Sequence, residues 1–111
     1  MFVVVFFLQV KAQSKFGQDS IACITNISLY QDAYKAKNYS DAFEPWRWVF
    51  LNCPASSQNI YKHGPIILKQ RIKDKPESKI EYIDTLMMLY DQRINYFGNE
   101  GFVLGRKGSD F

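Results

Sequence analysis

Histidine and cysteine are scarce in this chain of 111 residues, which contains one His and two Cys. A structural zinc site takes four ligands of these types, so we expect neither a metal site of this kind nor a cofactor. The formal net charge of +3 is too small to indicate a nucleic-acid-binding protein. Hydrophobic residues at 47% and charged residues at 23% exclude a disordered or collagen-like chain.

Long apolar runs are also lacking, apart from one over residues 1–10. A helix needs about 20 apolar residues to cross a bilayer, so we expect no integral membrane span in the mature chain. The run has the length of a signal-peptide core, and Val10 and Ala12 occupy the −3 and −1 positions of a cleavage site before Gln13. These features predict a signal peptide over residues 1–12 and a flexible N-terminus over 13–19.

Two observations leave the interpretation of this leader open. No Lys or Arg precedes the apolar run, although a signal peptide normally begins with positive charge, so the leader could be truncated. Its Val and Phe residues also favour a buried β-strand.

Aromatic residues are abundant, at 16% of the chain, and they give a small domain enough ring surface to bury a core. Outside the leader no segment alternates like a strand. Residues of one helix face instead recur three or four positions apart, as in Ile21, Ile24, Ile27 or Ser28, Tyr30 or Gln31, and Tyr34. The sequence therefore predicts an all-α protein whose helices span residues 20–36, 41–52, 57–73 and 77–97.

The first two helices are joined by a short connection, so we expect them to lie antiparallel. Asn38 and Tyr39 would form the turn, and Ser40 would cap the second helix. Pro45 removes one N–H group from that helix. Either the helix bends there, or it begins near Glu44 with Pro45 in its first turn.

The second pair of helices, within residues 56–98, is less regular. Gly64 and Pro65 interrupt the third helix, where we expect a kink or a break. Gly98 follows the fourth helix as its C-terminal stop. Residues 99–111 would form a loop leading to a helix that the sequence does not contain, because Ser109 and Asp110 resemble a helix cap.

The spacing in the first pair matches a tetratricopeptide unit, with a small residue early in the second helix, an aromatic residue four positions later and a proline twelve positions later. Ala42, Trp46 and Pro54 stand at these intervals, and Leu29 falls where the repeat expects Leu. Tyr30 is a departure, because the repeat prefers Gly or Ala there. An ordinary α-hairpin that matches by chance is the alternative.

Short motifs extend this pattern along most of the chain: Ser28-Leu29-Tyr30, Lys37-Asn38-Tyr39-Ser40-Asp41-Ala42, Trp46-Arg47, Phe50, Cys53-Pro54, Ile60-Tyr61, Asp84-Thr85-Leu86-Met87, Tyr90-Asp91-Gln92-Arg93-Ile94, Tyr96-Phe97-Gly98 and Gly105-Arg106-Lys107-Gly108. Together they resemble the start of secreted bacterial tetratricopeptide-repeat proteins. The resemblance implies a right-handed helical repeat, an exported protein of the periplasm or cell envelope, and a scaffold without catalytic residues. His63-Gly64-Pro65 departs from the pattern.

The two cysteines are equally distant from the predicted turn. Cys23 lies fifteen residues before Asn38 and Cys53 fifteen residues after it. At about 1.5 Å per residue, both lie about 22 Å from the turn in an antiparallel pair. An even cysteine count in an exported chain supports a disulfide between them. Two buried free thiols are the alternative.

Few residues suggest catalysis. His63 has no serine, cysteine or metal partner in the sequence, so we expect a loop or surface histidine. Asp84 and Asp91 share a helix face, which could serve acid–base chemistry, although a solvated face is the simpler interpretation. Arg93 could hold the following loop by pairing with a carboxylate.

Two basic segments also have simple interpretations. Gly105-Arg106-Lys107-Gly108 could bind an anion, but it lacks the preceding strand of a phosphate-binding loop, so a turn is the better interpretation. Lys69, Arg71, Lys73 and Lys75 alternate through the end of the third helix and therefore point different ways. We expect a solvated helix end there.

The sequence thus favours a protein-interaction scaffold that binds a protein or peptide, and no nucleic acid. Stacked helix pairs leave a concave face lined by their first helices, which would carry Gln31, Tyr34 and Lys35. Trp48 is a separate candidate, because Trp46 and Trp48 cannot both point into one core. The alternative is a helical subunit or fragment of an enzyme whose active site lies in missing sequence.

Overall fold

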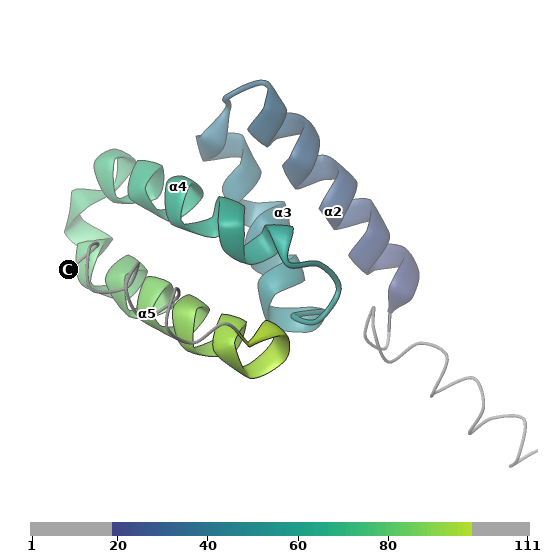
Figure 1. Ribbon diagram of the computed structural model, residues 1–111. Coiled ribbons are helices and arrows are strands. Elements are labelled where there is room, and N and C mark those ends of the chain that lie inside the picture. Colours follow the sequence, from purple (N-terminus) through teal and green to yellow (C-terminus); the bar gives the residue numbers. More distant parts are fainter. Residues whose placement is uncertain (1–18, 99–111) are drawn as a thin grey trace, which may run out of the picture.

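The computed structural model describes residues 19–98, and these form an all-α structure without strands (Figure 1). Its elements follow one another in the order α2 Ser20–Lys35, α3 Tyr39–Asn52, α4 Asn59–Asp74, the 3₁₀ turn η1 Pro76–Ser78, and α5 Lys79–Phe97. Each α-helix packs on the next one in the chain. The predicted signal peptide, the loop over residues 99–111 and its basic motif lie outside the described residues.

Asn38, rather than Ser40, caps α3. Its side chain accepts a hydrogen bond from the backbone N–H of Asp41 at 3.4 Å and donates to the Asp41 carboxylate at 2.6 Å. Lys37 adopts a left-handed backbone conformation with φ of 59°, which reverses the chain. The prediction of a Ser40 cap was therefore wrong, because the turn is completed two residues earlier than expected.

Pro45 lies within α3, which begins at Tyr39, so the predicted later start near Glu44 is wrong. The missing Pro45 N–H leaves the carbonyl of Asp41 without its helical partner. Asp41 is exposed, so water can satisfy that carbonyl and the helix tolerates the proline.

The predicted break in α4 does not occur, because the helix is continuous from Asn59 to Asp74. Gly64 and Pro65 are both buried in it. A Cβ atom at Gly64 would lie 2.7 Å from Trp46 Cζ2 and collide with the side chain of Leu89. The glycine therefore allows α4 to approach both α3 and α5 closely.

Aromatic rings from α3 and α4 form the centre of the core. Trp46 and Phe50 stack with their ring centroids 5.1 Å apart, and Phe50 and Tyr61 meet edge to face. The indole N–H of Trp46 donates to the carbonyl of Ile60 at 2.9 Å. This bond satisfies a polar group that is fully buried, as a stable core requires.

The predicted apolar stripe of α2 is wrong at its start. Ile21 is 79% exposed and Ile24 is 52% exposed, whereas Cys23 and Tyr30 are fully buried. The core face therefore passes through residues 23, 27, 30 and 34. The bond from Cys23 to α3 turns that face inward and the two isoleucines outward.

The last helix begins at Lys79, after the turn η1, rather than at residue 77. It ends at Phe97, and Gly98 follows as its C-cap. The φ of Gly98, 74°, is a conformation that glycine adopts readily. Among residues 19–98, no helix combines the length and the apolar character that crossing a bilayer requires.

Candidate functional site

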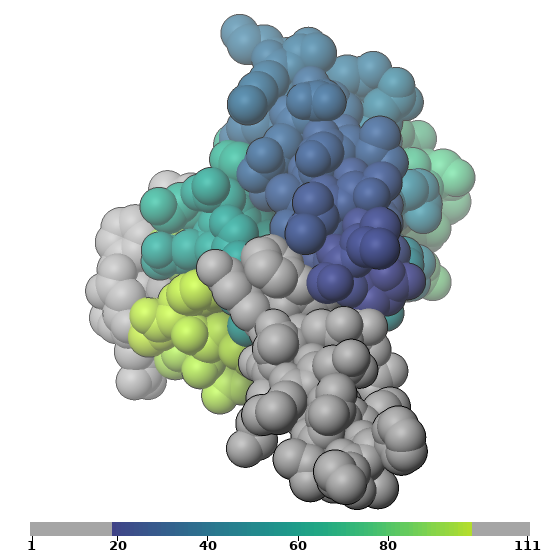
Figure 2. Space-filling view, turned by 90° about the vertical axis from the view of Figure 1, so that its right-hand side faces the viewer, coloured from purple at the N-terminus to yellow at the C-terminus, as the bar shows by residue number. Residues whose placement is uncertain are grey.

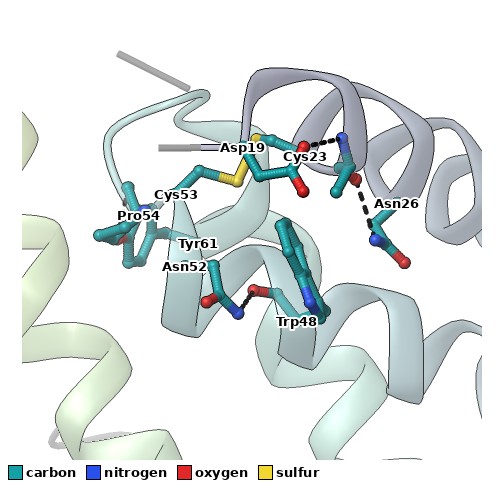
Figure 3. Close-up of a disulfide and its surroundings, with 9 residues drawn as sticks. Asp19, Cys23, Asn26, Trp48, Asn52, Cys53, Pro54 and Tyr61 are labelled. Atoms are coloured by element: carbon teal, nitrogen blue, oxygen red, sulfur yellow. Dashed lines mark hydrogen bonds between the residues drawn. A yellow bond between two sulfur atoms is a disulfide. The ribbon is translucent and has the colours of Figure 1, made fainter. Parts of the chain in front are cut away.

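A disulfide joins Cys23 of α2 to Cys53 at the end of α3, with the two Cα atoms 6.4 Å apart (Figure 3). Both residues are buried. The cross-link closes the open end of the hairpin, opposite the turn at Asn38, as the equal spacing predicts. The disulfide at one end and the turn at the other hold α2 against α3.

The predicted binding residues Gln31, Tyr34 and Lys35 lie in the second half of α2, and Lys35 is exposed while the other two are half-buried. The ring of Tyr34 stacks on the imidazole of His63, with centroids 4.0 Å apart and an angle of 23° between the planes. Tyr39 also packs against Tyr34, with the ring centroids 5.2 Å apart. These five residues are called the Tyr34–His63 surface below.

His63 was expected on a loop or on the surface, but the structure shows it half-buried within α4. No sequence spacing indicates its neighbours, which come from α2. In the space-filling view α2 lies beside the first half of α4 on one face of the molecule (Figure 2). Contacts between these two helices thus bring the candidate residues together.

A hydrogen bond beneath this surface links the two helices. The hydroxyl of Tyr30 lies 3.2 Å from Nδ1 of His63. Burial raises the pKa of Tyr30 to about 12, so its hydroxyl keeps its proton and donates. Burial, with a smaller effect of the Lys62 charge, lowers the pKa of His63. A neutral imidazole that accepts at Nδ1 fits both effects.

The Tyr34–His63 surface offers aromatic faces, the Gln31 amide and the Lys35 ammonium. Such a combination suits contact with a peptide, because aromatic rings supply contact area and the polar groups set its direction. His63 already uses Nδ1 for the hydroxyl of Tyr30.

Trp48 lies at a different place, beside the disulfide (Figure 3). It is half-buried and packs against the core. Together with Asp19, Leu51 and Asn52 it lines an open depression of about 290 Å³. The structure thus separates Trp48 from the other predicted binding residues.

The remaining chemical candidates do not form one enclosed site. Asp84 and Asp91 are exposed on α5, whereas Arg93 is buried. Within residues 19–98, no three His, Cys, Asp or Glu side chains lie close enough to hold a metal ion.

The prediction of a solvated end of α4 was wrong for one of its four basic residues. Lys69, Lys73 and Lys75 are exposed. The side chain of Arg71 is only 19% exposed, because its guanidinium lies over the ring of Phe43, 4.5 Å from the centroid. No sequence pattern indicates this contact between α4 and α3.

No protein-family model, curated protein or solved structure matches this chain significantly. The likeness to tetratricopeptide repeats therefore rests on the motifs and helix order of this chain alone.

Proposed function

We propose that this chain is a non-catalytic protein-interaction module of an exported, tetratricopeptide-like scaffold in the bacterial cell envelope. The observation that carries the proposal is the stacking of Tyr34 on His63. This contact joins α2, the first helix of one pair, to α4, the first helix of the next pair. First helices line the binding face of a helical repeat array.

Export is supported by the disulfide between Cys23 and Cys53. Stable disulfides form in the periplasm and outside cells, and they are rare in the cytosol. The apolar run and cleavage motif at residues 1–12 agree with this location.

A peptide or protein partner is supported by the makeup of the Tyr34–His63 surface. Tyr34 packs against the core, and Tyr39 and His63 pack against Tyr34, so binding would order few side chains and lose little entropy. Tyrosine is also enriched among residues that dominate binding energy. Lys35 at its edge would favour an acidic group on the partner.

Site-specific cross-linking in cells tests this proposal. A photo-cross-linking amino acid replaces Lys35 in the full chain, and a second version carries it at exposed Lys79 on α5 as a control. We expect one discrete cross-linked protein from position 35, lost when Tyr34→Ala is added, and none from position 79. Equal products from both positions, or none from position 35 in folded protein, would contradict the proposal.

A further inference from the structure

A second cavity lies between α3, α4 and α5, away from the Tyr34–His63 surface. Its volume is about 290 Å³, near the lower end of the range for small-molecule sites, so it fits a side chain or another small group. It is lined by Phe43, Glu44, Arg47, Arg71, Glu81, Tyr82 and Thr85. It is called the Arg71 cavity below.

Arg71 is held rigidly at this cavity. Its guanidinium lies 4.5 Å from the ring centroid of Phe43 and 5.8 Å from that of Tyr82. Its Nε donates a hydrogen bond of 3.0 Å to the hydroxyl of Tyr82. The two rings meet edge to face, 5.6 Å apart. A guanidinium fixed in this way loses little freedom when it binds a carboxylate.

The acidic residue nearest to Arg71 pairs with it only weakly. Oε1 of Glu44 is 4.0 Å from Nη2 of Arg71, and the Glu44 side chain is 71% exposed. That distance exceeds a hydrogen bond, and an exposed pair of this kind contributes little to stability. Glu44 can therefore move into solvent at low cost and leave the outer edge of the guanidinium to a ligand.

We propose that the Arg71 cavity binds a single carboxylate group of a peptide, supplied by an acidic side chain or by the chain terminus. Arg71 would hold it through two parallel N–H bonds, while Glu44 turns away. Arg47, which also lines the cavity, would add a second positive charge. Glu44 and Glu81 disfavour a doubly charged phosphate. This proposal is independent of the proposed function, because no residue that lines the Arg71 cavity belongs to the Tyr34–His63 surface.

NMR titration of the oxidised full chain tests the proposal through the Nε–Hε resonance of Arg71. The probes are acetyl-Ala-Glu-Ala-amide for a side-chain carboxylate and acetyl-Ala-Ala-Ala with a free terminus. Acetyl-Ala-Gln-Ala-amide is the neutral control. We expect a saturable shift with at least one acidic probe and none with the control. The acidic probe that binds with the higher affinity shows whether the cavity prefers a side-chain carboxylate or a chain terminus.

Two surface variants give opposite expectations. Glu44→Gln removes the competing carboxylate and should tighten binding of the acidic probe about two- to fivefold. Arg47→Gln removes a positive charge and should weaken binding about two- to fivefold. Both factors correspond to the usual energy of one exposed charge pair. Each variant has a control with the same charge change outside the cavity. Asp32→Asn on α2 matches Glu44→Gln, and Lys62→Gln in the first half of α4 matches Arg47→Gln. Both controls should leave the affinity for the acidic probe unchanged.

The proposal is overturned if the neutral control shifts the resonance as much as the acidic probes, or if inorganic phosphate alone produces a saturable shift. It is also overturned if each lining variant behaves like its matched control. None of these variants replaces Phe43 or Tyr82, the two rings that hold Arg71.

Discussion

The hydroxyl of Tyr30 on α2 lies 3.2 Å from Nδ1 of His63 on α4. The two residues are 33 positions apart in the chain, and Tyr30 is fully buried. Their bond crosses from the first helix pair to the second, directly beneath the stacked rings of Tyr34 and His63. The candidate binding surface therefore depends on a buried polar contact.

His63 should make stability depend on pH. Burial lowers its pKa in the folded chain below the ordinary value of 6.5, so the unfolded chain binds this proton at a higher pH. The contribution of His63 to the free energy of unfolding is complete above about pH 6.5 and falls as the pH decreases toward the folded pKa. Denaturant unfolding between about pH 7.5 and pH 5 measures this loss.

The His63→Gln variant is the control for that experiment, because Gln does not titrate in this range. Carboxylates elsewhere affect both proteins equally, so only the difference between the two pH curves matters. Parallel curves would mean that His63 is not linked to folding.

Loss of the disulfide should destabilise the chain strongly. The bond closes a loop with a sequence separation of 30, which corresponds to about 3–4 kcal/mol in the chain-entropy view. We expect a Cys23→Ala, Cys53→Ala double variant to lose this amount in denaturant unfolding. A reducing agent should lower the stability of the natural chain and leave that of the variant unchanged. A loss below about 1 kcal/mol would show that the cross-link constrains little.

Gly64→Ala should destabilise the fold by about 1–3 kcal/mol, the usual cost of overpacking a core. The added methyl group would meet Trp46 at 2.7 Å and collide with Leu89, although alanine favours a helix intrinsically. Ser28→Ala on the exposed face of α2 is a suitable control and should not lower the melting temperature. A stabilised Gly64→Ala variant would contradict the close packing of α4.

Asn38→Ala should cost about 1 kcal/mol through loss of the α3 cap. Thermal unfolding measures the change, and Asn38→Asp should recover most of the stability because aspartate is also a good cap. A melting temperature of Asn38→Ala equal to that of the natural chain would contradict the role of Asn38 as the cap of α3.

Local sequence patterns were sufficient for much of the fold. The absence of strands and the positions of the helices follow from the spacing of apolar residues and from turn residues, and the observed helix boundaries lie within two residues of the predicted ones. The disulfide followed from counting residues on either side of Asn38. These features depend on neighbours in sequence or on a single hairpin.

The errors arise where distant contacts decide the outcome. In α2, the spacing of apolar residues predicts that Ile21 is buried. The disulfide instead fixes the rotation of the helix so that Cys23 is buried and Ile21 is exposed. Gly64 was taken as a breaker, but close packing against Trp46 keeps it within α4. The positions of His63 and Arg71 depend on rings from other helices. No local pattern encodes such pairings. Of the five residues of the Tyr34–His63 surface, Gln31, Tyr34 and Lys35 could therefore be named from the sequence, whereas Tyr39 and His63 could not.

The most direct test of the central claim is the affinity of the oxidised chain for the partner identified by cross-linking at position 35. Calorimetry compares the natural chain with Tyr34→Ala and, as a matched tyrosine truncation on α5, Tyr96→Ala, whose side chain is exposed. The account predicts that Tyr34→Ala weakens binding by about tenfold or more, as loss of a central aromatic contact does, while Tyr96→Ala changes it little. Unchanged affinity for Tyr34→Ala, in a variant that keeps its fold, would contradict the Tyr34–His63 surface as the binding site.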